Sequence, residues 1–588
     1  MSSTLESLPP ELLLKITSYV SLQSLRSLRL SSRHLNDVFS NNEWTVYHNA
    51  ALYHAYARPE CMDLSDAKAS NMRYPIKDPA CDGWKDYCRR CFLLDRTWAG
   101  VGHSEPETKA YREDSQNIHR IKVDEELGLL FTSSRPGAKA AICVTDLKTG
   151  ALLWKTPSDY VRAWAHVEYG RGFLVFDRIS GQKEIWRLAD DIDNSSVSAS
   201  PPDTSQMEAF SVTSRHHGRS GRGRLRPWAL LTMPEMTRAC RFVYPTFLAA
   251  SQNTAYLWDL PSARLVQTLH GFQAMHNDIE PLGDVRYVDV DARHVVLCGQ
   301  NGIRVISRED SSVVLRLSNT GSSTMLMSPE LTQGSDRIPL VSPLKTEHMR
   351  SRDGHPWGRF RAAHLSETGR DLACLLADGR LVLIRDFERA VSGNVPIADA
   401  ALEVDLTHVR RSNQNLTYSL VARRNTRAGY YLAFEQGRVV VATSSGLYVV
   451  TLDASQRGLS IHGASAEDKS TVLQPPQSED GISENTEIAV SWLPRISDAE
   501  VLQHISCLQL SATRLYITWQ ANRVDVIPNR HCNVTAQVWK DDPPYYEPDV
   551  KNVWTGRPMV HPRGPLRDPG FVVLCVDFGA SAGGEVRY

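Results

Sequence analysis

The chain has 588 residues, with 66 Lys and Arg against 67 Asp and Glu and a formal net charge of −1. This length exceeds one ordinary core, so we expect a small unit joined to a large one, or a repeat architecture. Balanced charge gives no general electrostatic basis for binding nucleic acid or a membrane surface, and no stretch approaches about 18 uninterrupted apolar residues. Because no basic segment precedes an apolar run at the N-terminus, we expect no signal peptide and a location in the cytoplasm and/or nucleus.

Eleven cysteines, an odd number, are spread along the chain without the spacing of a disulfide framework. Five of them lie in apolar, strand-like runs: Cys143, Cys298, Cys374, Cys507 and Cys575. Buried free thiols behave as small apolar groups, and this usage fits a reducing compartment.

Residues 8–44 predict three short helices. Pro9 and Pro10 suit a first helical turn, where a missing N–H has no intrahelical partner to lose, and Glu11 favours the positive end of the helix dipole. Apolar residues follow at helical spacing, and serines stand where caps are needed. The positions are Leu12, Ile16 and Val20 in the first helix, Leu22, Leu25 and Leu28 after Ser21, and Leu35, Val38 and Phe39 after Ser31 or Ser32.

A segment of about forty residues rarely buries this much apolar surface by itself. The excess leucines therefore need a partner surface, either the rest of this chain or another protein. Helix-in-groove contacts and protein cores use the same spacing, so the residues alone leave both interpretations open.

The same residues resemble an F-box, through Leu8-Pro9-Pro10-Glu11-Leu12, Ile16, the Leu22/Leu25/Leu28 run, Leu30-Ser31-Ser32-Arg33, Leu35-Asn36 and Trp44. The pattern departs from the family at His34, near which a tryptophan is frequent. The resemblance covers under a tenth of the chain and implies an F-box at residues 5–52. Such a domain docks on a Skp-type adaptor and, through it, on a cullin ubiquitin ligase. The adaptor contacts expected here are Leu8, Pro9, Leu12, Ile16, Leu25 and Leu30.

Residues 53–114 are expected to link the F-box to the rest of the chain. Residues 43–58 read as helix, residues 59–83 as a loop with three prolines, and residues 84–98 as an amphipathic helix. This last helix resembles the linker helix of F-box proteins with WD repeats, which ends in a tryptophan that packs against the propeller. Trp98 stands in that place.

Cys88 and Cys91 form a C-x-x-C pair in this helix, with Cys61 and Cys81 upstream. A zinc site would use such a pair, but its companions are irregularly spaced and the pair lies in a helical pattern. We therefore favour packing on a helix face and expect no metal.

From about residue 118 the apolar period changes from helical to two-residue, which is typical of strands. Seven units each contain an apolar strand, a tight turn and a second apolar strand. They lie at residues 128–156, 171–188, 245–269, 294–317, 371–387, 438–453 and 514–527. Turns such as Asn301-Gly302 and Asp378-Gly379 supply the positive φ that hairpins require. Even distribution along the chain predicts a repeat rather than one sandwich.

The third unit carries Trp258-Asp259 and resembles a WD-repeat blade, in which this dipeptide closes the third of four strands. Thr145-Asp146, Arg385-Asp386 and Leu452-Asp453 look like degenerate versions. The Gly-His dipeptide of the family is mostly missing and the spacing is irregular. We predict a multidomain chain: a small all-α F-box with linker helices, then an all-β, diverged WD-repeat-like β-propeller at residues 115–588. Seven blades are expected, with six and eight left open.

The excess length falls in insertions near residues 190–237, 320–358, 391–427 and 455–500, which we expect to be disordered loops. The first contains a basic run, Arg215 to Arg226. A solvated loop is the favoured interpretation, and a partner-binding or nuclear-import patch is the alternative. His216-His217 lies in the same loop and is not expected to bind metal.

No catalytic motif is recognisable: there is no G-x-S-x-G, no H-E-x-x-H and no Walker loop. We expect a non-catalytic protein without cofactor, the substrate receptor of an SCF-type (Skp–cullin–F-box) ubiquitin ligase. Its propeller would bind a protein target, phosphorylated in one version of the hypothesis. The arginines considered for such a propeller site are Arg238, Arg304, Arg359 and Arg361, although the sequence does not show that they converge.

Two other functions stay open. One is a ligand-binding or enzymatic propeller with a helical cap, which predicts His, Asp and Arg side chains around the central channel. The other is an F-box scaffold that binds the adaptor but recruits no target for degradation.

Overall fold

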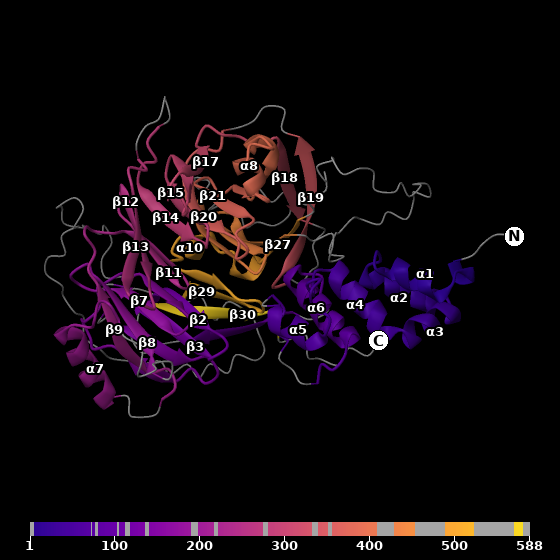
Figure 1. Cartoon of the computed structure of the whole chain (residues 1–588), viewed down its shortest axis with the longest axis horizontal. Helices are drawn as coiled ribbons and strands as arrows, with labels where there is room; N and C mark the ends of the chain where they lie inside the picture. Colours follow the sequence, from indigo (N-terminus) through magenta and orange to yellow (C-terminus); the bar gives the residue numbers. More distant parts are fainter. Residues whose placement is uncertain are drawn as a thin grey trace.

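The structure is a computed structural model that shows a helical arm joined to a β-propeller (Figure 1). It describes residues 5–71, 73–76, 80–102, 105–111, 118–135, 140–189, 198–216, 221–273, 280–331, 339–350, 356–407, 428–452, 488–521 and 570–579. Of the helices in these ranges, none combines the length and the apolarity needed to cross a bilayer.

Where the structure describes it, the helical arm has one 3-10 helix and six α-helices. They are η1 (Leu5–Ser7), α1 (Pro10–Thr17), α2 (Leu22–Ser31), α3 (Arg33–Asn41), α4 (Glu43–Tyr53), α5 (Leu64–Ser70) and α6 (Trp84–Trp98). The expected caps are present, since the side chains of Ser21 and Ser32 accept from the N–H groups of Ser24 and Leu35. The structure corrects the expected loop at residues 59–83, because α5 lies inside it. With seven residues and only Ala67 buried, α5 is too short to produce a helical pattern.

Each propeller blade has four antiparallel strands. In each blade, the first strand named lies at the channel and the last lies at the outer edge. Blade 1 is β2 (Ile118–Asp124), β3 (Leu129–Ser134), β4 (Ile142–Asp146) and β5 (Leu152–Lys155). Blade 2 is β6 (Val167–Gly170), β7 (Phe173–Asp177), β8 (Lys183–Leu188) and β9 (Leu225–Leu231). Blade 3 is β10 (Ala239–Val243), β11 (Thr246–Ala250), β12 (Thr254–Asp259) and β13 (Arg264–His270). Blade 4 is β14 (Val285–Val290), β15 (His294–Gly299), β16 (Gly302–Ser307) and β17 (Val313–Ser318).

Blade 5 is β20 (Phe360–Leu365), β21 (Leu372–Leu376), β22 (Leu381–Ile384) and β23 (Ala401–Val404). Blade 6 is β24 (Gly429–Glu435), β25 (Arg438–Thr443), β26 (Gly446–Thr451) and β27 (Ala489–Trp492). Blade 7 is β28 (Leu508–Leu510), β29 (Arg514–Gln520), β30 (Phe571–Asp577) and β1 (Glu107–Tyr111). The innermost strands of successive blades contact one another in a closed ring. The expected seven blades are therefore present.

Strand β1 closes the ring from the N-terminal side, because it pairs with β30 near the other end of the chain. This placement differs from the expected domain limit, which assigned residues 53–114 to linker helices. Of the expected hairpin at 514–527, the first strand is present as β29, and residues 522–527 lie outside the described ranges. Both edges of β29 are already occupied, by β28 and β30, and residues 522–569 lie outside the described ranges.

A hairpin of β18 (Met325–Leu331) and β19 (Ser342–Arg350) joins the outer strands of blades 5 and 6. β18 runs parallel to β23, and β19 runs antiparallel to β27, so the two blades form one ten-stranded sheet. This hairpin lies in the insertion expected near residues 320–358.

The other expected insertions also contain regular structure. Residues 190–237 include α7 (Thr204–His216) and the outer strand β9. Residues 391–427 include the end of α8 (Glu388–Val391), then α9 (Ile397–Ala400) and β23, and residues 455–500 include β27, η5 (Pro494–Ile496) and the start of α10 (Ala499–Leu502). The basic run is partly folded too, because Arg222 forms an ion pair with Asp146 of blade 1. The parts at 190–197, 217–220, 408–427 and 455–487 lie outside the described residues.

Candidate functional site

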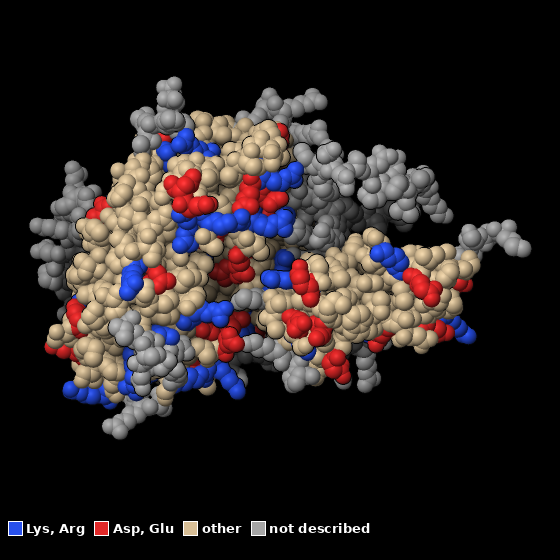
Figure 2. Space-filling view, in the orientation of Figure 1, with Lys and Arg blue, Asp and Glu red and all other residues tan. Residues whose placement is uncertain are grey.

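The far end of the helical arm exposes large apolar side chains. Leu12 on α1 is 51% exposed and Leu30 near the end of α2 is 78% exposed, and Leu5 and Tyr19 are exposed beside them in sequence. Figure 2 shows mostly uncharged atoms over this arm, with scattered charges between them. Water-exposed leucines of this kind are the feature that a protein partner would cover.

The six residues expected to contact an adaptor fall into three groups. Leu12, Leu30 and Pro9 are exposed, and Leu8 and Ile16 are half-buried. Leu25 differs, because it is 1% exposed and belongs to the core that the arm shares with the propeller. We therefore correct its assignment from direct contact to support of the helices that carry the other five.

Arg29 fixes the position of α2 and was missed by sequence reasoning. Its guanidinium donates from Nε to Asn36 Oδ1 at 3.0 Å, from Nη1 to the Tyr47 hydroxyl at 2.9 Å and from Nη2 to Ser40 Oγ at 2.9 Å. These bonds tie α2 to α3 and α4, and the neighbouring Leu30 is left facing solvent. No local signal distinguishes such an arginine from a solvated one.

Trp98 joins the arm to the propeller, as the resemblance implied. Its ring stacks on Phe578 with centroids 3.6 Å apart, and its Nε1 donates to the Ala512 carbonyl at 3.1 Å. Ser491 Oγ donates to the Trp98 carbonyl at 2.9 Å. One apolar cluster runs from α1–α6 into strands of blades 6 and 7, so the arm and the propeller share a core.

A buried ion pair crosses the same junction. Asp95 on α6 accepts from Arg438 Nη2 on β25 at 2.8 Å and from the Tyr74 hydroxyl at 2.8 Å. Both charged side chains are almost completely buried. Burial raises the pKa of Asp95 against the opposing effect of Arg438, and burial lowers the pKa of Arg438.

The cysteine pair in α6 is buried. Cys88 Sγ donates to the Tyr47 carbonyl at 3.3 Å, and burial raises the pKa of Cys88 and of Cys91. Within the described ranges, no three His, Cys, Asp or Glu side chains gather in a way that could hold a metal ion.

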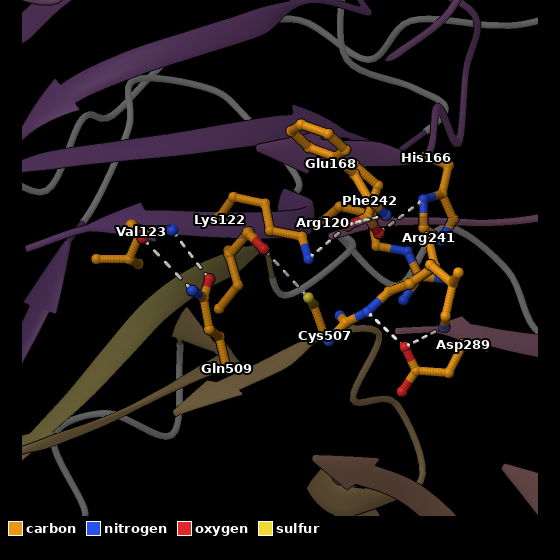
Figure 3. A network of polar contacts seen from close by, with 12 residues as sticks. Arg120, Lys122, Val123, His166, Glu168, Arg241, Phe242, Asp289, Cys507 and Gln509 are labelled. Carbon is orange, nitrogen blue, oxygen red and sulfur yellow. Dashed lines mark hydrogen bonds and ion pairs between the residues drawn. The ribbon is translucent and has the colours of Figure 1, made fainter. Parts of the chain in front are cut away.

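The second candidate site is the central channel of the propeller. All seven inner strands line it, and it contains Arg, His and Glu side chains (Figure 3). Five cations line it, Arg120, Lys122, Arg238, Arg241 and Arg286, against the two carboxylates Glu168 and Glu435.

Two carboxylates in and beside the channel connect neighbouring blades. Glu168 on β6 pairs with Lys122 on β2 at 2.9 Å and accepts from the backbone N–H of Phe242 on β10 at 3.4 Å. Asp289 on β14 lies 3.2 Å from Arg241 Nε on β10. These contacts connect the inner strands of blades 1 to 4.

Asp289 also binds His364 on β20, at 3.1 Å from its Nδ1. The other ring nitrogen of His364 lies 2.5 Å from the Tyr287 hydroxyl. Burial raises the pKa of Asp289, but Arg241 and His364 outweigh it and lower that pKa to about 2. Asp289 is therefore expected to be an anion at neutral pH, and both nitrogens of His364 are engaged in contacts within the protein.

The four candidate arginines do not converge on one point. Arg238 lines the channel, and Arg361 lies near the lining residue Arg286, since burial and then the charge of Arg286 lower the pKa of Arg361. Arg304 is buried on β16, the third strand of blade 4, and Arg359 is exposed just before β20. Neither of these two belongs to the channel lining.

Comparison with known proteins adds one match in the arm. Residues 5–49 match the family model described as F-box-like. None of the curated proteins matches the chain. Solved structures with some likeness include the WD40 repeats of RRP9, at 11% identity over 70% of this chain and 89% of that one, with a TM-score of 0.37. The U3-55K structure shares 11% identity over 80% and 99% of the two chains, with a TM-score of 0.39.

A third likeness is to the β-propeller domain of Cps50 (Swd1) from Myceliophteria thermophila, at 12% identity over 71% and 97% of the two chains, with a TM-score of 0.35. At such scores the likeness is weak, so the propeller is assigned from its own strand pairing. Residues 5–49 match an F-box-like domain, and a seven-bladed β-propeller follows the linker helices.

Proposed function

We propose that this chain is the substrate receptor of an SCF-type ubiquitin ligase, present in the cytoplasm and/or nucleus. The observation that carries the proposal is the set of water-exposed leucines on the F-box-like domain, with Leu12 and Leu30 as its most exposed predicted contacts. An adaptor of the Skp type would cover these side chains and connect the chain to a cullin. No residue of this chain is assigned a catalytic role.

The mechanism is positioning. The arm carries the adaptor-binding surface at one end and is continuous with the propeller core at the other. A target protein held by the propeller is thereby kept at a set distance from the ubiquitin-carrying enzyme, which raises the effective concentration of its lysines.

Adaptor co-purification tests the proposal. Leu12→Asp and Leu30→Asp place a charge in the surface that the adaptor would bury, and we expect each to reduce recovery of a Skp-type adaptor and cullin at least tenfold. The double substitution Leu8→Ala with Pro9→Ala tests the start of α1. The matched control is Leu265→Asp on β13, where a leucine 43% exposed lies on the propeller. Full recovery with the first two variants would contradict the proposal.

A ligand-binding or enzymatic propeller is the second candidate. It is favoured by the channel, where His166, Arg120 and Arg241 lie with Asp289 (Figure 3). His364 also lines the channel and binds Asp289. Both ring nitrogens of His364 are already engaged, one by Asp289 Oδ2 and the other by the Tyr287 hydroxyl, so neither faces a ligand with an open position. This candidate predicts that the chain is purified without adaptor or cullin.

An adaptor-binding scaffold without degradation activity is the third candidate. It predicts adaptor recovery like that of the receptor, but unchanged half-lives of the proteins bound by the propeller when the chain is deleted. A lengthened half-life of a bound protein supports the receptor.

A further inference from the structure

Trp164 stands exposed between blades 1 and 2. The residue is 50% exposed and has φ +61°, in the left-handed region that a bulky residue rarely adopts. Strained backbone persists where the surrounding structure holds it, and it concentrates at functional sites. An exposed indole in such a conformation therefore calls for a partner.

An arginine and a histidine hold this indole in place. The edge of His119 meets the ring at 4.8 Å between centroids, and the Arg135 guanidinium lies 5.6 Å from the same ring. Arg135 also lies 3.5 Å from the Phe571 ring centroid, and its Nη2 donates to the His504 carbonyl at 2.7 Å. The result is a surface of aromatic and cationic groups in contact with one another.

This surface continues into the channel through neighbours in sequence. Arg120 follows His119 on β2, and His166 lies two residues after Trp164. Arg120 and His166 line the channel. Arg120 donates from Nη1 to the Tyr431 hydroxyl at 3.0 Å and to the Ser506 carbonyl at 2.5 Å. Its buried Nε has no hydrogen-bond partner among the described residues.

The channel keeps excess positive charge after its internal pairs are counted. Lys122 pairs with Glu168, Arg241 pairs with Asp289, and Arg238 lies 3.9 Å from Asp284. Among the described residues, Glu435 is then the one lining carboxylate left against the two arginines Arg120 and Arg286. Arg120 forms no ion pair with a carboxylate in the described ranges, and Arg286 is bonded to the neutral Gln300 at 3.4 Å. An anionic partner would supply the missing charge.

We propose that the target-docking surface is the channel rim around Trp164, Arg135 and Arg120, and that it binds an acidic peptide segment carrying an apolar side chain. The carboxylates of the segment face Arg120 and Arg286, and the apolar side chain packs on Trp164. Tryptophan and arginine are the residues that most often dominate protein interfaces. A single-stranded nucleic acid would require several stacking rings along a basic groove, and Trp164 is one ring. The inference rests on the proposed receptor function, since it names the chemistry of that receptor's target.

Selection from a display library of random 12-residue peptides on the full chain tests the proposal. We expect enriched peptides to be acidic with at least one aromatic or large aliphatic residue, and their binding to weaken as salt screens the charges. Enrichment of neutral or basic peptides, or no enrichment, would overturn the proposal.

Affinities of an enriched peptide for variants then locate the site. Trp164→Ala and Arg120→Gln should each weaken binding at least about tenfold. Trp44→Ala is the matched control, because Trp44 is 53% exposed on the arm, and it should bind the peptide normally. Equal affinity of the Trp164→Ala variant and the unaltered chain would refute the assignment.

The same variants separate this inference from the proposed function. Trp164→Ala should retain adaptor recovery while losing the peptide, and Leu12→Asp should lose the adaptor while retaining the peptide. Loss of adaptor recovery with Trp164→Ala would mean that the residue acts through folding, which a melting curve of the variant would record.

Discussion

The ion pair between Asp95 and Arg438 gives the sharpest test of how the arm is joined to the propeller. The two side chains come from α6 and β25, and each is at most 1% exposed. Asp95→Leu removes the carboxylate, Arg438→Met removes the guanidinium, and the double variant replaces the pair with apolar groups. The three variants form a double-mutant cycle.

The expected magnitudes follow from burial. Either single substitution breaks the 2.8 Å contact and leaves the other charged side chain buried, and such breaks cost about 3–5 kcal/mol of the free energy of unfolding. The double variant removes both charges and should cost far less than the sum of the singles. Its remaining cost is about 1–3 kcal/mol, because the Tyr74 hydroxyl loses its acceptor.

Hydrogen exchange of peptides from α6 and β25, measured at increasing urea concentrations, gives these free-energy costs at the junction of arm and propeller. The exposed pair Arg293–Glu388, at 2.6 Å, is the control, and Arg293→Met should cost less than about 1 kcal/mol. If the double variant loses as much stability as the two singles together, the buried charges are not coupled and the reasoning fails.

Three further predictions concern single side chains. Trp98→Ala removes the ring that stacks on Phe578 and should cost about 3–5 kcal/mol in urea unfolding; a cost below about 1 kcal/mol would contradict the shared core. Arg29→Ala removes three hydrogen bonds within the arm, so amides of α2 should exchange faster while those of the propeller do not change. Burial raises the pKa of Glu435 to about 7, above its value in the unfolded chain. As the pH rises, the unfolded chain therefore loses this proton first. The free energy of unfolding should fall by at most about 3 kcal/mol between pH 4.5 and 7. Glu435→Gln should flatten that part of the stability–pH curve, and an unchanged curve would exclude the carboxyl as its source.

The propeller could be predicted because its middle strands are buried on both faces. In β11, β15 and β25 every residue is buried, so each reads as an uninterrupted apolar run next to another. The outer strand β13 begins with three exposed residues, and β9 follows a long insertion. The outer strands β9, β23 and β27 fell in the predicted insertions, whereas β5, β13 and β17 lie at the ends of the predicted strand units.

The closure of the ring and the arm–propeller junction could not be predicted locally. β1 meets β30 across almost the whole chain, and Asp95 meets Arg438 across 343 residues. Similarly, helical spacing groups Leu25 with the exposed leucines, although the packing of the arm buries it. Which face of α2 turns inward is decided by α3, α4 and Arg29, and not by the sequence of α2.

A receptor that works by positioning needs its two ends held in one orientation, and the junction has features that provide this. Apolar contacts such as Trp98 on Phe578 hold the parts together, but such contacts tolerate small shifts in register. A buried ion pair does not, because a shift of a few ångströms would break the contact between Asp95 and Arg438 while both side chains stay buried. Because the desolvation of two buried charges opposes their attraction, we expect the pair to contribute little net stability. We infer that it is retained for orientation, so that the apolar double variant would stay folded while the angle between arm and propeller became less well defined.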